Sequence, residues 1–323
     1  MTVRWGILGA GSVAQRRVIP AMQGLQSCQV GALMVRDQDR ARQLATGSGV
    51  PRAYTSVDAL LHDTELDAVY VSSPPNLHCE HVVAAAECGL HVLCEKPMAL
   101  STGECRRMID ACAAAGVHLE VCFVLRGWPI YQRVRQIIAD GRLGQIVEIR
   151  AHLAKWTPRK PGEWRLDPRQ GGGGVLIDVG SHYIDLFRFL LGDLTQVTAM
   201  TSDRVFGAGV EESAFMLFEF AGGEHGTIAA TSAVPIAGNV LEIFGTRGAL
   251  LLGKSLRIVT AEEETDEPAE FPDYYRGLLD HFCRCVESGG EPLASGEDGL
   301  VNIAVIQAAY QSVAEARTVA VRP

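Results

Sequence analysis

The 323-residue sequence predicts an α/β protein with two domains. The first is a doubly wound parallel sheet, and the second is an α+β domain with a large, mostly antiparallel open sheet. Strand and helix patterns alternate through residue 124, a glycine-rich turn joins the first strand to the first helix, and hairpin patterns fill residues 195–262. Because one hydrophobic core rarely serves so long a chain, we expect domains at residues 1–123 and 124–323.

The composition is that of a well-packed globular protein, with 47% hydrophobic and 21% charged residues. The formal net charge of -9 argues against nucleic acid or an anionic membrane as a partner, because neither attracts an acidic surface. The first residues lack a basic segment followed by a long apolar core, and no apolar stretch is long enough to span a bilayer. We therefore expect a cytoplasmic protein.

The nine cysteines are expected to be buried, reduced thiols, because their number is odd and they form no CxxC pair. His78, Cys79 and His81 form the one cluster that suggests a metal. Since no second ligand pair follows at a suitable spacing, we expect no metal site.

A buried strand at residues 3–8 leads directly into the sequence GAGSVA and then into a helical pattern at residues 15–25. Gly9 and Gly11 allow a tight turn whose backbone N–H groups can approach a pyrophosphate at the helix N-terminus. Ala14 takes the place of a third glycine. We assign Gly9, Gly11, Ser12 and Val13 to a cofactor-binding turn of a Rossmann domain, although the motif alone is a weak signal.

The rest of the first domain repeats the alternation, which strengthens that assignment. Strands are predicted at residues 29–35, 67–73, 91–94 and 117–124, and helices at 39–47, 80–89 and 101–116. Ligands in such sheets bind beyond the carboxyl ends of the strands, so Glu95 and Lys96 are expected in the cofactor cleft. A lysine there can donate a proton or act as a point charge beside a nicotinamide, and the alternative is a charged surface turn.

The second domain begins with a helix that Gly141 and Gly144 end. Strands and hairpins are predicted at residues 145–156, 195–205, 212–234, 239–252 and 255–262. The acidic segment 262–272 is predicted to be a solvated loop, and residues 298–318 a helix that covers a sheet face. The uncovered face of the sheet is the expected oligomer surface.

Four glycines, 171–174, precede a helix that begins near Val175, and they are expected to let the backbone approach a ligand. Asp178 and His182 are four residues apart and therefore share a helical face, which makes a proton-transfer pair possible. The alternative is that Asp178 caps the helix and His182 packs beneath it.

Three segments together, GILGAGSVA, SSPPNLHCEHVVAAAECGLHVLCEKPMAL and GGGGVLIDVGSHYIDL, resemble the Gfo/Idh/MocA family of nicotinamide-dependent oxidoreductases. The family is named for glucose-fructose oxidoreductase and inositol dehydrogenase, and the resemblance runs over nearly the whole chain. It implies that Lys96 is the catalytic lysine near the nicotinamide and that Glu95 helps to hold the nicotinamide ribose. Which of Lys96 and His182 is the main acid–base group stays open.

The resemblance also implies roles for other residues of both domains. Asn76 and His78 would line the cofactor, with backbone contacts from Ser72 and Pro74. Asp178 and His182 would face the substrate, with Lys96 polarising its oxygen and His182 taking or supplying its proton. The expectation behind all of these roles is that Lys96 and the Asp178–His182 helix act on one bound nicotinamide.

Three further positions resemble family sites and have structural alternatives. Arg126 would lie near the substrate or could be a surface arginine. Trp164 and Arg165 resemble a pair that approaches the cofactor in members that use NADP. Tyr275 could reach the cleft or could belong to an amphipathic helix.

The residues after the second strand bear on the choice of cofactor. Val35 stands where a ribose-binding acid is usual in NAD sites, whereas Arg36 could pair with a 2′-phosphate. NADP is therefore preferred, and Asp37 keeps NAD as the alternative. The predicted function is an NAD(P)-dependent oxidoreductase acting on the CH–OH group of a sugar, polyol or related small molecule. The rivals are a non-catalytic dinucleotide sensor and a glycosidase-like enzyme that recycles NAD.

Overall fold

The computed structural model describes residues 2–235, 238–271, 273 and 275–323. The chain forms two compact units, which are described separately. The first unit comprises residues 1–127 and 272–300, and the second comprises residues 128–271 and 301–323. The single boundary predicted at residue 123 lies close to the end of the first segment, whereas residues 272–300 of the first unit fall outside the predicted first domain.

The first unit is built on a six-stranded parallel sheet in the order β3-β2-β1-β4-β5-β6. Its strands are β1 (Val3–Leu8), β2 (Cys28–Met34), β3 (Arg52–Tyr54), β4 (Ala68–Val71), β5 (His91–Cys94) and β6 (Leu119–Val121). The strand order reverses between β1 and β4, which is where ligands bind in open α/β sheets. The predicted doubly wound sheet is confirmed.

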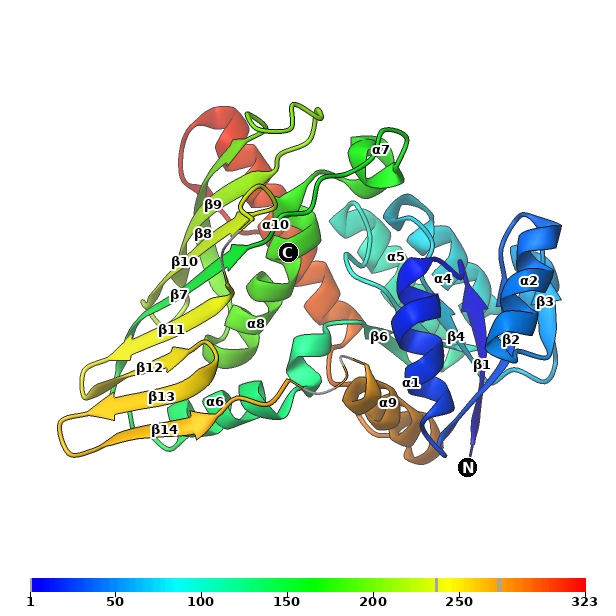
Figure 1. Ribbon diagram of the computed structural model, residues 1–323, viewed down its shortest axis with the longest axis horizontal. Helices are drawn as coiled ribbons and strands as arrows, with labels where there is room; N and C mark the ends of the chain where they lie inside the picture. The colour runs from blue at the N-terminus through cyan, green and yellow to red at the C-terminus, as the bar shows by residue number, and fades with distance from the viewer. Residues whose placement is uncertain (1, 236–237, 272, 274) are drawn as a thin grey trace. The chain divides into compact units, whose positions relative to one another are not determined.

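Helices flank this sheet, most of them in the blue-to-cyan part of the chain in Figure 1 and one, α9, drawn in orange. They are η1 (Ala14–Val18), α1 (Ile19–Gln23), α2 (Gln38–Ser48), α3 (Val57–Leu61), η2 (Pro75–Leu77), α4 (His78–Glu87), α5 (Thr102–Ala115), η3 (Val124–Gly127) and α9 (Arg276–Ser288). A capping box between Ser101 and Glu104 starts α5, and Gly116 in the left-handed conformation ends it.

Helix α9 packs on the sheet of the first unit although it lies far along the sequence. Phe282 contacts Trp5 with ring centroids 5.4 Å apart, and Cys283 Sγ lies 3.4 Å from Cys28 Sγ. Ser27 Oγ donates a hydrogen bond to Asp280 at 3.0 Å. These contacts explain why residues 272–300 belong to the first unit.

The second unit contains a nine-stranded sheet in the order β14-β13-β12-β11-β7-β10-β9-β8-β15. Its strands are β7 (Ile146–Ala154), β8 (Leu194–Ser202), β9 (Ser213–Phe220), β10 (His225–Thr231), β11 (Val240–Gly245), β12 (Gly248–Leu252), β13 (Ser255–Thr260), β14 (Glu264–Pro268) and β15 (Val319–Ala320). Among the strands that the structure describes in this sheet, only β7 and β10 pair in parallel, so the predicted mostly antiparallel sheet is confirmed.

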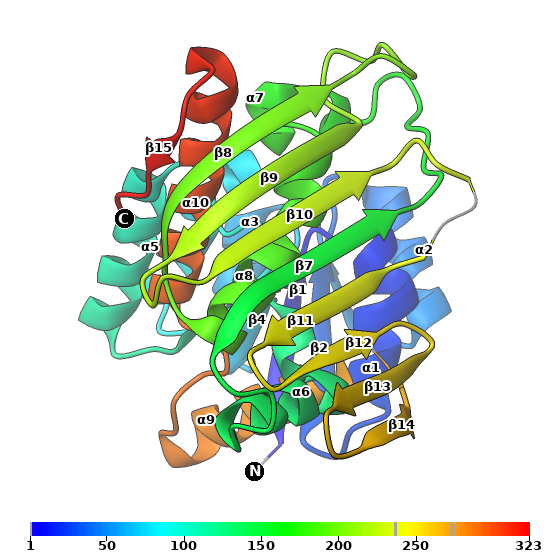
Figure 2. The same cartoon turned by 90° about the vertical axis from the view of Figure 1, so that its left-hand side faces the viewer.

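One face of this sheet carries the helices of the second unit, and Figure 2 shows the opposite face turned toward the viewer. The helices are α6 (Pro129–Ala139), η4 (Trp164–Leu166), α7 (Pro168–Gly171), η5 (Leu176–Gly180), α8 (Ser181–Leu191) and α10 (Gly296–Glu315), which crosses the division at residue 300. Met200, Phe215 and Leu217 are 73%, 54% and 49% exposed. They lie on β8 and β9, where Met200 pairs directly with Phe215, and so form a continuous apolar patch.

The prediction of a loop at residues 262–272 was wrong in its centre, where Glu264–Pro268 form the edge strand β14; Pro272 lies outside the described residues. Alternate side chains of this strand are exposed, and its acids have partners. Arg257 pairs with Glu264 and Arg133 with Glu267, at 2.7 and 2.8 Å. An acidic edge strand also resists pairing with another sheet, so its charge does not exclude strand structure.

Candidate active site

The glycine turn after β1 has the geometry that the sequence predicts. Gly9 has φ +81°, and a Cβ there would lie 2.8 Å from the backbone nitrogen of Ser73. A Cβ on Gly11 would meet nothing closer than 3.8 Å, so one side of this backbone stays open. The open side of Gly11 allows a pyrophosphate to approach this backbone closely. The N–H groups of Gly9 and Gly11 themselves donate to the carbonyl oxygens of Met34 and Gly9, at 3.2 and 2.6 Å.

The helix that follows the turn starts at Ser12 and Val13, whose side chains are exposed. Ala14 is 1% exposed, as the close packing of helix on sheet requires. The first full turn of this helix is the π-helix η1. π-Helical turns are rare in proteins overall, but many of those known lie at functional sites.

The loop after β4 touches the glycine turn and the segment after β5. Ser72 Oγ donates to the carbonyl oxygen of Gly9 at 2.7 Å. The ring nitrogens of His78 lie 2.8 Å from the carbonyl oxygen of Ser73 and 3.0 Å from that of Pro97. Burial lowers the pKa of His78. The His78 ring therefore links two loops through their backbone.

Pro74 and Asn76 lie in the same loop, around η2. Pro74 precedes η2 and is half-buried, whereas Asn76 is exposed. Asn76 thus has the accessible side chain of this loop, and its role as a cofactor contact stays a prediction.

Glu95 and Lys96 follow β5 directly, and both are half-buried. Glu95 Oε1 accepts hydrogen bonds from the hydroxyls of Tyr70 and Tyr275, at 2.5 and 2.8 Å. Glu95 Oε2 accepts one from the backbone N–H of Lys96 at 3.2 Å. Burial, together with the Glu95 charge, raises the pKa of both tyrosines, so their hydroxyls remain protonated donors.

The residues after β2 separate into an exposed arginine and a helix cap. Arg36 is exposed. Asp37 is the N-cap of α2, and its carboxylate accepts a hydrogen bond from the backbone N–H of Arg40 at 2.8 Å. Asp37, the acid that could have bound the ribose of NAD, is therefore used in capping α2.

Asp178 lies in the π-helix η5, and it does not cap the helix, because Val175 holds that position. Arg159 Nη2 lies 2.8 Å and Arg165 Nε 3.8 Å from Asp178 Oδ2. The Arg165 guanidinium stacks 4.1 Å from the centroid of the Trp164 ring. The second unit thus brings Asp178, Trp164 and Arg165 together. His182 is half-buried near the start of α8.

The glycine loop before η5, residues 171–174, was expected to approach a ligand, but its closest contacts are with other residues of the protein. A Cβ on Gly173 would overlap the Tyr310 hydroxyl, and one on Gly174 would overlap the Glu211 carbonyl oxygen. Glu211 Oε1 accepts hydrogen bonds from the backbone of Gly174 and Leu176 and from Tyr310, at 2.9, 3.0 and 2.8 Å. Glu211 and Tyr310 therefore have a structural role in fixing this loop.

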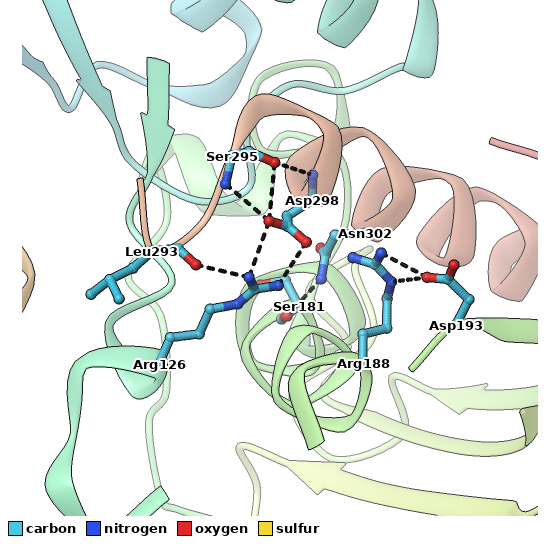
Figure 3. A network of polar contacts seen from close by, with 8 residues as sticks. All are labelled: Arg126, Ser181, Arg188, Asp193, Leu293, Ser295, Asp298 and Asn302. Atoms are coloured by element: carbon cyan, nitrogen blue, oxygen red, sulfur yellow. Dashed lines mark hydrogen bonds and ion pairs between the residues drawn. The ribbon is translucent and has the colours of Figure 1, made fainter. Parts of the chain in front are cut away.

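Arg126 is buried in the first unit, at the end of η3 (Figure 3). Its guanidinium lies 2.9 and 3.0 Å from the two carboxylate oxygens of Asp298 and donates to the carbonyl oxygen of Leu293 at 2.9 Å. Asp298 also accepts a hydrogen bond from the backbone N–H of Ser295. Arg126 is therefore not a surface arginine, because these bonds occupy its guanidinium in a buried network. The substrate contact expected of it stays a prediction.

The carboxyl ends of neighbouring parallel strands bring most predicted residues of the first unit to one edge of the sheet. The glycine turn follows β1, the Ser72 loop follows β4, and Glu95 and Lys96 follow β5. Two residues of the site were not predicted from the sequence, Tyr70 and Arg159. The only signal for Tyr70 was a polar side chain inside a buried strand, and the only signal for Arg159 was a basic side chain near a glycine loop.

Over the described residues, no group of three or more His, Cys, Asp or Glu side chains could hold a metal. Among the helices of the described residues, none combines the length and the apolar character that a membrane span requires.

Known protein families match both units of the chain. A family model described as "Oxidoreductase family, NAD-binding Rossmann fold" matches residues 3–123, and the "GFO/IDH/MocA C-terminal domain" matches residues 131–251. The chain is 33% identical to 1,5-anhydro-D-fructose reductase of Ensifer adhaerens, over 95% of this chain and 96% of that protein. It is 33% identical, over the same shares, to D-xylose 1-dehydrogenase (NADP(+)) 2 of Haloferax volcanii.

A solved structure agrees over the full length. The aldose-aldose oxidoreductase of Caulobacter crescentus, in complex with glycerol, is 28% identical with a TM-score of 0.90, covering 99% of this chain and 100% of that one. The resemblance drawn from the three sequence motifs is thereby confirmed.

Proposed function

We propose that this chain, which belongs to the Gfo/Idh/MocA family of NAD-binding oxidoreductases, transfers a hydride between nicotinamide C4 and the CH–OH carbon of a sugar or polyol. The observation that carries the proposal is the placement of Glu95 and Lys96 at the sheet edge that also holds the open glycine turn. The named activities of the relatives support the substrate class.

The bound dinucleotide would supply or accept the hydride, and the protein would position the substrate and move a proton. Gly9 and Gly11 would let the pyrophosphate approach the turn, and the backbone N–H groups of Ser12 and Val13 at the helix start would bind it. Glu95 would hold the nicotinamide ribose, with Ser72, Pro74, Asn76 and His78 forming the adjoining loop. Trp164 and Arg165 would contact the cofactor from the second unit.

Proton handling is assigned to Lys96 and His182. Lys96 would polarise the substrate oxygen, and His182 would take its proton during oxidation or supply it during reduction. Asp178 would bind the substrate beside His182. Its ion pair with Arg159 supports a role as a hydrogen-bond acceptor.

A direct test measures binding of NADPH and NADH by fluorescence, followed by depletion of the reduced dinucleotide with a panel of keto sugars. Binding together with turnover of at least one sugar is expected. Binding without turnover of any polyol or sugar in either direction would favour a dinucleotide sensor.

NADP is the proposed cofactor. The exposed Arg36 can pair with a 2′-phosphate. Asp37 supports this choice, because its carboxylate caps α2 and is less available to the hydroxyls of a ribose. The NADP-dependent relative is consistent with it.

Arg36→Ala should therefore lower the preference for NADPH over NADH by about 10- to 100-fold, since a charge-assisted hydrogen bond is lost. The measurement is the dissociation constant of each dinucleotide. Arg42→Ala, which removes another exposed arginine of α2, is the matched control and should leave the ratio unchanged. An unaltered ratio in Arg36→Ala would contradict NADP as the cofactor.

The exposed apolar patch of Met200, Phe215 and Leu217 supports a homodimer or homotetramer assembled through the open sheet. We expect Phe215→Lys to shift the wild-type oligomer to the monomer in sedimentation velocity, because it buries an unpaired charge in the interface. Val205→Lys adds the same charge at an exposed apolar residue outside this patch and should leave the oligomer intact. A wild-type chain that sediments as a monomer would contradict the proposal.

A further inference from the structure

Glu95 is held by two tyrosines from distant parts of the chain. Tyr70 lies on β4, and Tyr275 immediately precedes α9, 180 residues after Glu95. Both hydroxyls donate to the same oxygen, Oε1, at 2.5 and 2.8 Å. A carboxylate oxygen has two lone pairs, so these two bonds occupy Oε1 and leave Oε2 the more accessible oxygen for a further donor.

Each tyrosine is fixed by its surroundings. Tyr70 is fully buried on a strand that lies between β1 and β5. Tyr275 is 8% exposed, and the helix that it precedes is attached to the first unit by the Ser27–Asp280 hydrogen bond. At the same end of the helix, a Cβ on Gly127 would lie 3.3 Å from the Leu278 nitrogen, which shows how closely the two backbones approach.

We propose that Tyr70 and Tyr275 are positioning residues, which hold Oε1 of Glu95 so that Oε2 is presented to the nicotinamide ribose. This inference rests on the proposed function, in which Glu95 binds that ribose. Oε2 also accepts the Lys96 backbone N–H at 3.2 Å, so the same arrangement ties the carboxylate to the residue that carries the proposed catalytic amine.

The physical reason is pre-organisation. A glutamate side chain has several rotatable bonds, and ordering it only when a ligand binds reduces affinity. Two donors from separate elements of the fold restrict the carboxylate before binding. Helix α9 therefore has a function in cofactor binding without touching the cofactor: it brings the Tyr275 hydroxyl to Glu95.

The test is a double-mutant cycle read out as the dissociation constants of NADPH and NADH. Tyr70→Phe and Tyr275→Phe remove one hydroxyl each and keep the ring. Each should weaken binding of the preferred dinucleotide by about three- to tenfold, the range expected for one hydrogen bond. In the Glu95→Ala background, the same changes should have less than about a 1.5-fold effect, because no carboxylate is left to position.

Tyr54→Phe is the matched control. It removes another tyrosine hydroxyl that donates to a carboxylate, that of Asp63 at 3.0 Å, and should leave both dissociation constants unchanged. Thermal unfolding of every variant is measured in parallel. If one tyrosine variant does not fold, the double-mutant cycle is completed with the other tyrosine variant and Glu95→Ala.

The outcomes separate this inference from the function on which it rests. If the wild-type protein binds neither NADPH nor NADH, the proposed function fails and the positioning role fails with it. If the wild type binds but both phenylalanine variants bind within about twofold of it, only the positioning role is overturned. Equal losses in the wild-type and Glu95→Ala backgrounds overturn it in the same way, because they show that the hydroxyls act independently of Glu95.

Discussion

Replacing Lys96 with alanine is expected to lower kcat/KM by about 10²- to 10⁴-fold, the usual contribution of a positioned proton donor. Lys96 follows Glu95 at the carboxyl end of β5, where the side chain is half-buried. Because Glu95, the glycine turn and Arg36 remain, NADPH should still bind with nearly the wild-type dissociation constant. The loss therefore belongs to turnover.

The measurement is steady-state depletion of NADPH with whichever sugar the wild type reduces, combined with a binding titration on the same samples. Lys254→Ala, which removes an exposed lysine between β12 and β13, is the control and should retain wild-type kinetics. A Lys96→Ala enzyme with half or more of the wild-type kcat/KM would show that the lysine takes no part in the chemistry.

Glu120→Gln should change the pH dependence of stability by about 2–4 kcal/mol between about pH 5 and about pH 8. Glu120 lies on β6 and is fully buried. Within the described residues its oxygens have no hydrogen-bond partner, although the backbone N–H groups of Leu293 and Ala294 face them without reaching hydrogen-bond geometry. Burial raises the pKa of Glu120 to about 8, against the weaker opposing effect of those N–H groups and of Arg126.

The sign follows from proton binding. In the unfolded chain the Glu120 carboxyl has an ordinary pKa, so between about pH 4.5 and about pH 8 the folded protein binds the proton more tightly. Its contribution to stability is complete below that window and is lost as the pH rises through it. Glutamine cannot ionise, so the free energy of unfolding of Glu120→Gln should gain on that of the wild type as pH increases.

Denaturant unfolding at several pH values measures this difference. Glu87→Gln, at an exposed position of α4, provides the control and should follow the wild-type pH dependence. Parallel curves for Glu120→Gln and the wild type would mean that Glu120 is already ionised in the folded protein.

The long elements of the fold could be predicted because their patterns are local. The parallel strands, the hairpins at residues 221–226 and 245–248, and the C-terminal helix each depend on periodicity or turn residues that lie within a short window. The short elements β3, α3 and β15 could not, since a strand of two or three residues forms only because a neighbouring strand offers its edge. The acidic strand β14 was missed for a related reason, because arginines from other elements neutralise its charge.

The site divides in the same way. Gly9, Glu95 and Lys96 were predicted because their motifs are short and follow strands directly. The hydrogen bonds of Tyr70 and Tyr275 to Glu95 were not, since they join residues separated by 25 and 180 positions. The Arg159–Asp178 pair and the burial of Arg126 against Asp298 also depend on tertiary packing, which no local pattern encodes.

The most direct test of cofactor binding at this sheet edge is a crystal structure of the protein with NADPH. The pyrophosphate should lie over the turn of Gly9 and Gly11, the nicotinamide ribose on Glu95 Oε2 with Lys96 Nζ beside the ring, and the 2′-phosphate on Arg36. A dinucleotide whose nicotinamide end lies away from Glu95 and Lys96 would contradict this account.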